Sequence, residues 1–182
     1  MEKKTILIAT NAQKVLHFLI EHPIRDFLEC EIQKKTKISK AGVNLALRDL
    51  VTTDFLFRTK RGKTFFYTLN HKNLIVKQLK IIKTINHLNG LLKKLKPLAS
   101  KIILFGSSSR GENTPDSDID LLIISHNKGS VQEQIKILKS KREIQPIICS
   151  NIEFLEKKKK DPIFYEQVNK GVVLWEGSEH DL

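Results

Sequence analysis

Two small groups of residues that can do chemistry lie close together in the middle of the chain. Gly106 ends one short apolar run, and Asp118 and Asp120 lead into another. Short apolar runs bounded by glycine and polar residues are typical of buried strands. The sequence therefore predicts a strand over residues 102–105, a glycine turn, and a second strand over residues 121–124.

The glycine turn, Gly106-Ser107, is suited to an anion. A residue without a Cβ lets backbone N–H groups approach a ligand closely, and a helix that follows the turn would direct its first N–H groups at the same ligand. A phosphate is the expected ligand, held by Gly106 and Ser107 with Arg110 as a further partner.

The two carboxylates alternate with apolar residues in the sequence Asp-Ile-Asp-Leu. Because side chains along a strand point to alternate faces, Asp118 and Asp120 are expected on one face and the apolar pair in a core. Adjacent carboxylates repel unless a cation lies between them, and Mg²⁺ or Mn²⁺ favours carboxylate oxygens that leave room for water and phosphate. The pattern predicts a metal-bound nucleoside triphosphate, with Asp118 and Asp120 as metal-binding and catalytic residues.

The complete run resembles a known signature. Gly-Ser, ten further residues and Asp-Ile-Asp is similar to the motif of the nucleotidyltransferase superfamily that includes DNA polymerase beta. The fuller sequence Gly-Ser-Ser-Ser-Arg-Gly, followed by Pro-Asp-Ser-Asp-Ile-Asp-Leu-Leu, most resembles the small prokaryotic members, the minimal nucleotidyltransferases. Residues 171–175 resemble their closing strand, so the similarity covers residues 98–177. It implies transfer of a nucleoside monophosphate from a triphosphate to an acceptor hydroxyl, with Mg²⁺.

The resemblance also implies a third carboxylate, on a neighbouring strand, that completes the metal site and helps to deprotonate the hydroxyl. The corresponding residue is Gln145, in a strand predicted over residues 143–148. A neutral amide cannot take up a proton near neutral pH or offset the charge of a metal. Glu143, about 7 Å away on the same strand face, would substitute if the strand bulged at Pro146. Catalysis and nucleotide binding without catalysis are both open.

Charge is distributed unevenly along the 182 residues, which are enough for one large or two small domains. Residues 1–96 carry 20 Lys and Arg against 7 Asp and Glu, a net charge of +13, whereas residues 97–182 carry 12 against 13, a net charge of −1. The first half is therefore expected to bind a polyanion, with double-stranded DNA as the partner. A lysine-rich proteome would raise the same count.

Three helices are predicted in the first half. The first has an apolar face at residues 15–20 and stops near Pro23, the second is a short helix that includes residues 27–32, and the third runs through residues 43–51 with Ser39 as its N-cap. This spacing suggests a helix-turn-helix.

A hairpin is predicted after the third helix. A basic, glycine-centred turn at residues 58–64 separates the apolar run 55–57 from the strand 65–69. Helix-turn-helix and basic hairpin together resemble the winged-helix DNA-binding domain over residues 10–70.

The resemblance implies two sets of DNA contacts. The exposed face of the third helix would enter a major groove, where Asn44 and Arg48 could read base edges. The basic hairpin residues would contact phosphates. The expected DNA-binding residues are Lys40, Asn44, Arg48, Arg58, Lys60, Arg61 and Lys63, with Ala41 and Leu45 on the same helix face. The alternative is a protein-interaction module whose charges are only solvated.

A linker helix is predicted over residues 71–96, ended by Pro97. Its apolar stripe, at a spacing of 4-3-4-3, is formed by Ile81, Ile85, Leu88, Leu92 and Leu95. Such a stripe is either intramolecular core or the seam of a homodimer that would match a palindromic DNA site. The predicted division is a winged-helix domain at 1–70, the linker at 71–96 and a nucleotidyltransferase domain at 97–182.

The fold class is α+β, with a winged helix-turn-helix, the linker helix and a small nucleotidyltransferase domain whose mixed sheet is flanked by helices. A helix is predicted at residues 131–138 after the loop 127–130, and Asp161-Pro162 opens another as N-cap and first residue. The lysine run 157–160 is expected to be a solvated helix face.

Membrane and secretory segments are not expected, because apolar runs stay short of the roughly twenty residues needed to span a bilayer. Cys30 and Cys149 lie in different halves and form no metal-type cluster. Both are expected to be free in a reducing cytoplasm.

Two functions fit these features. One is an enzyme that uses a nucleoside triphosphate as substrate. The other is a winged-helix transcriptional regulator whose degenerate transferase domain binds nucleotide as a ligand or holds a partner protein. The resemblance adds a further option, because some minimal nucleotidyltransferases are antitoxins that modify a partner protein.

Overall fold

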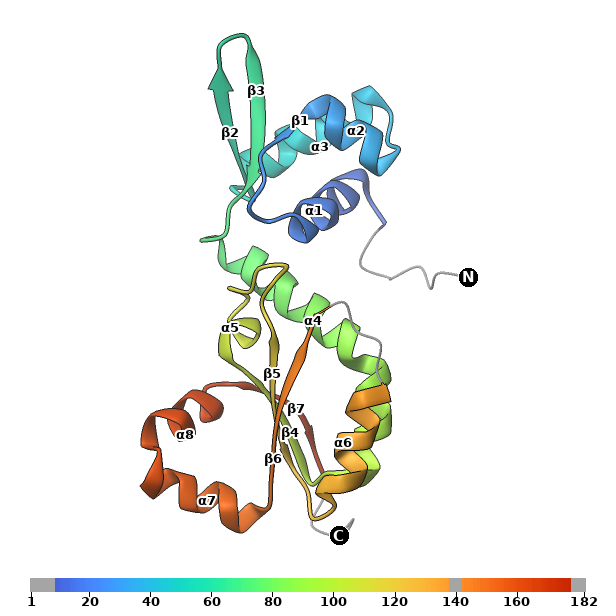
Figure 1. Cartoon of the computed structure of the whole chain (residues 1–182). Coiled ribbons are helices and arrows are strands. Elements are labelled where there is room, and N and C mark those ends of the chain that lie inside the picture. Colours follow the sequence, from blue (N-terminus) through green and yellow to red (C-terminus); the bar gives the residue numbers. More distant parts are fainter. Residues whose placement is uncertain (1–8, 138–141, 178–182) are drawn as a thin grey trace. The chain divides into compact units, whose positions relative to one another are not determined.

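The structure, a computed structural model, describes residues 9–137 and 142–177. The chain divides into two compact units, Met1–Lys77 and Gln78–Leu182, each with its own sheet (Figure 1). The functional division predicted at residues 70 and 96 stays a prediction.

Three helices build the first unit: α1 (Asn11–Glu21), α2 (Glu29–Thr36) and α3 (Lys40–Thr52). Thr10 and Gln13 form a capping box at the start of α1, and the hydroxyl of Ser39 accepts a hydrogen bond from the N–H of Gly42, so Ser39 is the N-cap predicted for α3. The apolar faces of the helices meet in a core. Its least exposed residues include Val15, Leu19, Ile32, Val43 and Leu47.

The sheet of the first unit is antiparallel, in the order β1 (Phe27–Leu28), β3 (Thr64–Leu69), β2 (Leu56–Arg61). Figure 1 shows β2 and β3 extending beyond the helices of their own unit as a hairpin. Three helices, a short strand between the first two and a terminal hairpin make the predicted winged helix-turn-helix.

Two details of this unit differ from the sequence-based expectation. Phe27 and Leu28 pair with Tyr67 and Phe66 of β3 and do not begin a helix. The reason is tertiary: Phe27 is 2% exposed and its backbone completes the sheet, so α2 starts only at Glu29.

The predicted hairpin turn over residues 58–64 is too long. The strands continue until Arg61 pairs with Thr64, which leaves only Gly62 and Lys63 between them. Gly62 has φ +59, a conformation that glycine adopts without strain. Arg58, Lys60 and Arg61 are therefore strand residues.

The second unit has a mixed four-stranded sheet in the order β6-β5-β4-β7. Strand β4 is antiparallel to β5 and β7, and β5 is parallel to β6. The strands are β4 (Lys101–Phe105), β5 (Ile119–Ile124), β6 (Ile144–Cys149) and β7 (Val172–Glu176). The mixed sheet predicted for this domain is confirmed.

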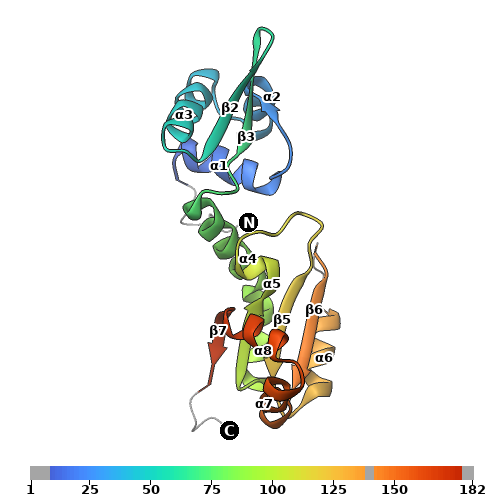
Figure 2. The same cartoon turned by 90° about the vertical axis from the view of Figure 1, so that its left-hand side faces the viewer.

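Helices cover both faces of this sheet. Figure 1 shows α4 and α6 on one side of the strands and α7 and α8 on the other, and Figure 2 shows α7 and α8 in front of the sheet. The helical segments are α4 (Leu74–Leu95), a 3₁₀ turn (Lys96–Leu98), α5 (Gly106–Ser109), α6 (Lys128–Ile137), α7 (Asn151–Lys160) and α8 (Pro162–Asn169). Asp161 caps α8 by accepting from the N–H of Phe164, as predicted, and the predicted helical residue Leu138 lies outside the described residues.

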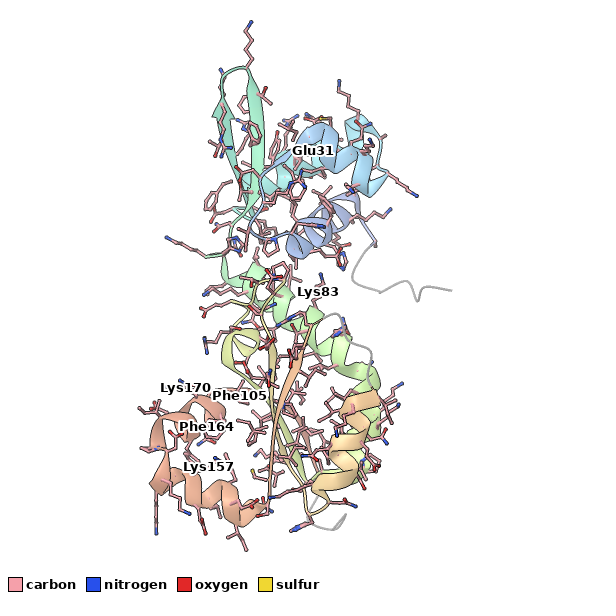
Figure 3. All side chains as sticks on the ribbon, viewed as in Figure 1. Glu31, Lys83, Phe105, Lys157, Phe164 and Lys170 are labelled. Atoms are coloured by element: carbon pink, nitrogen blue, oxygen red, sulfur yellow. The ribbon has the colours of Figure 1, made fainter. Side chains whose placement is uncertain are left out.

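The two faces have separate cores. Leu88, Leu92 and Leu95 of α4 pack with β4 and β5 on one face, so this part of the apolar stripe belongs to the core of a single chain. The homodimer stays a prediction. On the other face, the ring of Phe105 meets that of Phe164 edge-to-face at 5.7 Å (Figure 3).

The cysteines and the length and polarity of the helices bear on two further predictions. Both cysteines are free, Cys30 exposed and Cys149 buried. Within the described part of the chain, every helix is too short or too polar to span a bilayer.

Candidate functional site

The glycine turn and the second aspartate are in direct contact. Strand β4 ends at Phe105, which is paired with Asp120 of β5, and Gly106 follows with φ +68. A Cβ added to Gly106 would lie 2.1 Å from Oδ2 of Asp120. Only glycine lets the chain turn here with the carboxylate against it.

The alternation predicted around the aspartates is confirmed. Ile119 and Leu121 are fully buried in the core shared with α4, whereas Asp118 is exposed and Asp120 half-buried. Burial raises the pKa of the Asp120 carboxyl, and the negative charge of Asp118 raises it further. The two carboxylates therefore repel each other, as expected for a pair suited to a cation.

This donor set fits one divalent cation. Two carboxylates beside an open glycine turn leave coordination positions for water and phosphate oxygens, as Mg²⁺ requires. Within residues 9–137 and 142–177, groups of three His, Cys, Asp or Glu side chains placed to hold a metal are absent.

Gln145 occupies the position next to the pair. It is the register partner of Asp120, and its Nε2 donates a hydrogen bond to Oε1 of Glu143 at 3.2 Å. The β5–β6 register runs unshifted from Ile119 and Ile144 to the ends of both strands. Strand β6 thus continues through Pro146 without the bulge that would have moved Glu143 beside Asp120.

Arg110, the predicted phosphate partner, follows the four-residue helix α5. Its Nε forms an ion pair with Oε2 of Glu112 at 2.9 Å, and both side chains are about half exposed. Arg110 also opposes the raised pKa of Asp120, so its charge acts on the carboxylate pair.

Sequence reasoning missed Arg142, which lies just before β6. Its guanidinium donates to the carbonyl oxygens of Ser117 and Asp118 and to the hydroxyl of Ser108. A basic residue before a strand is the only sign of this role in the sequence, because the partners of Arg142 lie 24 to 34 residues away.

The predicted DNA-contact residues of the first unit are all at its surface. On α3, the exposed residues are Lys40, Ala41, Asn44, Leu45 and Arg48. On the hairpin, they are Arg58, Lys60, Arg61 and Lys63. Alternation along β2 places Arg58 and Lys60 on one face and Arg61 on the opposite one.

Arg58 lies on the hairpin face that carries Tyr67. Arg58 is paired with Tyr67 on β3, and burial raises the pKa of Tyr67, with the negative charge of Glu29 adding to the rise and Arg58 opposing it. Glu29 also accepts a hydrogen bond from Nδ2 of Asn44 at 3.4 Å. Asn44 of α3 is thus bonded to an acidic residue of α2, Glu29, whose negative charge also acts on Tyr67.

Arg61 has a different environment. Its guanidinium pairs with Asp26 and stacks on the ring of Phe66 at 4.7 Å. Asp26 also accepts from the hydroxyl of Thr68 at 2.7 Å. The structure therefore separates Arg61 from the other hairpin cations with which it was grouped.

A comparison with protein families agrees with the motif. The family described as nucleotidyltransferase domain matches residues 85–170. A putative nucleotidyltransferase from Sulfolobus solfataricus is 16% identical with a TM-score of 0.38, over 57% of this chain and 90% of that chain. TrmBL2, an archaeal chromatin protein, is 12% identical with a TM-score of 0.32, over 92% of this chain and 72% of that chain. A search of curated proteins found no match.

Residues 85–170 therefore form a nucleotidyltransferase domain, as the Gly-Ser and Asp-Ile-Asp motif predicted. The domain follows a winged helix-turn-helix in the same chain.

Proposed function

We propose that the C-terminal unit binds a nucleoside triphosphate together with Mg²⁺ or Mn²⁺ and transfers its nucleoside monophosphate to an acceptor hydroxyl. The observation that carries this proposal is the contact between Gly106 and Asp120, inside a domain of the nucleotidyltransferase family. In this contact the glycine turn lies beside one member of the carboxylate pair.

Each residue has a separate role in this proposal. Gly106 and Ser107 bind the triphosphate through the turn, and Arg110 leaves Glu112 to meet a phosphate. Asp118 and Asp120 hold the cation, which supplies charge stabilisation at the attacking and leaving oxygens when bound. Gln145 orients the acceptor by hydrogen bonding but does not take its proton, so turnover is expected to be slow.

A transfer assay tests the proposal. The full chain is incubated with each of four α-labelled nucleoside triphosphates, Mg²⁺ and candidate acceptors, including protein and nucleic acid, and label transfer is followed together with pyrophosphate release. Label should appear in an acceptor and disappear in Asp118→Asn and Asp120→Asn. Transfer that persists in both variants would assign the chemistry to another site.

The N-terminal unit suggests the second candidate function, a transcriptional regulator. The exposed basic residues of α3 and of the hairpin support DNA binding. The register of Gln145 beside Asp120 supports a C-terminal unit that binds nucleotide without turning it over. In this case nucleotide or a bound partner protein regulates the DNA contact.

Duplex DNA binding separates the candidates. The regulator requires binding that weakens steeply with salt and is reduced by Arg48→Ala, whether or not transfer occurs. Failure to bind a random-sequence duplex at low salt would exclude the regulator and leave the enzyme.

A further inference from the structure

The side chain of Arg142, just before β6, bonds to both halves of the motif, the segment after the glycine turn and the segment that leads into β5. Arg142 Nε donates to the carbonyl of Ser117 at 2.6 Å, and Nη2 donates to the carbonyl of Asp118 at 2.8 Å and to Oγ of Ser108 at 2.7 Å. Ser108 belongs to α5 after the glycine turn, whereas Ser117 and Asp118 lead into β5.

These acceptors lie on both sides of Asp118. The carbonyl of Ser117 belongs to the peptide group before Asp118, and the carbonyl of Asp118 belongs to the peptide group after it. Two fixed peptide planes define the φ and ψ of the residue between them and hence the direction of its Cα–Cβ bond. Because the Asp118 side chain is exposed, this backbone anchoring replaces the packing that orients buried side chains.

The serine hydroxyl extends the same network. Ser108 is 0% exposed, and its Oγ accepts from Arg142 while donating to the carbonyl of Asp118 at 3.3 Å. Arg142 and Ser108 therefore hold one carbonyl from two directions, and the glycine turn cannot move away from β5 without breaking these bonds.

Charge adds to the geometry. Asp118 and Asp120 both interact electrostatically with the Arg142 guanidinium. The positive charge of the guanidinium offsets the repulsion between the two carboxylates.

We propose that Arg142 is a positioning residue of the nucleotide site, which fixes the peptide groups on either side of Asp118 so that its carboxylate lies beside that of Asp120. The proposal rests on the function proposed above for the same site. In this proposal a residue just before β6 orients the carboxylate of Asp118, just before β5, relative to that of Asp120 in β5.

Arg142→Lys is the informative variant, because lysine keeps the charge but its single ammonium cannot reproduce the planar fork. Lys101→Gln is the matched control, since it removes a cation that pairs with Glu176 at 2.7 Å on another edge of the same sheet. Mn²⁺ binding is measured by electron paramagnetic resonance and binding of ATP, GTP, CTP and UTP by calorimetry, on the full chain.

Arg142→Lys should weaken Mn²⁺ binding about 10- to 100-fold, the usual effect of losing a residue that orients metal ligands. Lys101→Gln should bind like the wild type. Equal binding by Arg142→Lys and the wild type, or an equal loss in Lys101→Gln, would overturn the proposal.

Hydrogen exchange gives a readout that needs no ligand. Amides of residues 107–120 should exchange faster in Arg142→Lys and in Ser108→Ala, while those of β7 stay unchanged. If the wild type binds neither Mn²⁺ nor any of the four nucleotides, the proposed function fails, and the exchange result alone decides the role of Arg142. Unchanged exchange in this segment would reject that role even if nucleotide binds.

Discussion

Gly106 follows the end of β4 and lies against Asp120 at the start of β5, and each residue restricts which residue types fit at the other position. The turn needs φ +68, and the space that a Cβ would fill contains the carboxylate. Two residues that are far apart in the sequence motif therefore pack directly against each other in the fold.

Substitution of this glycine should damage the site directly. In Gly106→Ala, the backbone strain and the contact with Asp120 should cost about 1–3 kcal/mol of stability and abolish nucleotide binding. Gly90→Ala is the control, because Gly90 is exposed in α4 with open space around it. This substitution should stabilise the chain by about 0.5–1 kcal/mol. Urea unfolding and calorimetry measure both; nucleotide binding retained by Gly106→Ala would contradict this packing argument.

Gln145→Glu should have opposite effects with and without metal. A third carboxylate beside Asp120 adds repulsion, so the variant should unfold at a lower temperature in chelator than the wild type. With Mn²⁺ it should become the more stable protein and transfer label roughly tenfold faster or more, because a base has been restored. Gln145→Asn provides the uncharged control, and no gain in metal affinity in the Glu variant would show that this position does not face the cation.

At the scale of elements, the hairpin β2–β3 presents two different faces. Arg58 and Lys60 share one face of β2, whereas Arg61 is paired with Asp26 on the other. Their contributions to DNA binding and to folding are expected to differ accordingly.

DNA affinity should follow this division. Arg58→Ala and Lys60→Ala should each weaken duplex binding uniformly across sequences and reduce the slope of log affinity against log salt by about 1. Arg61→Ala should change the slope less and lower the stability of the N-terminal unit. Fluorescence anisotropy over a salt series tests this, and equal slopes for all three variants would return Arg61 to the DNA-contact group.

The contact between β3 and the segment before β1 should depend on pH. Hydrogen bonds from Thr68 and then Arg61 hold the pKa of the Asp26 carboxyl below its usual value of 3.8. Because the folded pKa is lower than the unfolded one, this stabilisation is complete above the unfolded pKa and is lost as pH falls through the folded value, below about pH 4.

Asp26→Asn should remove that part of the pH dependence. Urea unfolding between pH 7 and pH 3, followed by a probe in the N-terminal unit, should show a smaller acid loss in the variant than in the wild type. Parallel curves for the two proteins would mean that Asp26 is not responsible.

At the scale of the whole molecule, each unit has its own core and its own sheet. The larger basic excess falls in the first unit, where residues 1–77 carry 15 Lys and Arg against 7 Asp and Glu, whereas residues 78–182 carry 17 against 13. Domains built in this way usually retain their separate activities. Variants in one unit are therefore expected to leave the binding function of the other intact.

A cross-test checks this separation. Asp118→Asn should abolish Mn²⁺ binding but leave duplex DNA affinity within about twofold. Arg48→Ala should weaken duplex DNA binding but leave Mn²⁺ affinity within about twofold. Both ligands are measured on both full-length variants. A loss of DNA affinity in Asp118→Asn would instead indicate that the two sites are energetically coupled.

The sequence by itself determined the strand-turn-strand motif, the burial of Ile119 and Leu121, the caps of α3 and α8, and the nucleotidyltransferase domain. These features depend on period-two alternation, turn chemistry and the spacing of a motif, which act over short stretches of chain. The predicted metal, nucleotide and DNA contacts stay predictions.

Only the tertiary structure decided the strand at Phe27, the two faces of the hairpin, the unshifted register of Gln145 and the bonds of Arg142. Each depends on backbone groups that lie far apart in the sequence: Phe27 pairs with Tyr67, and Arg142 reaches back to Ser108. Local propensity depends only on residues that are close in sequence and cannot predict such partners. A strand pair or a bridging guanidinium stabilises the fold only after the chain has brought the two distant segments together.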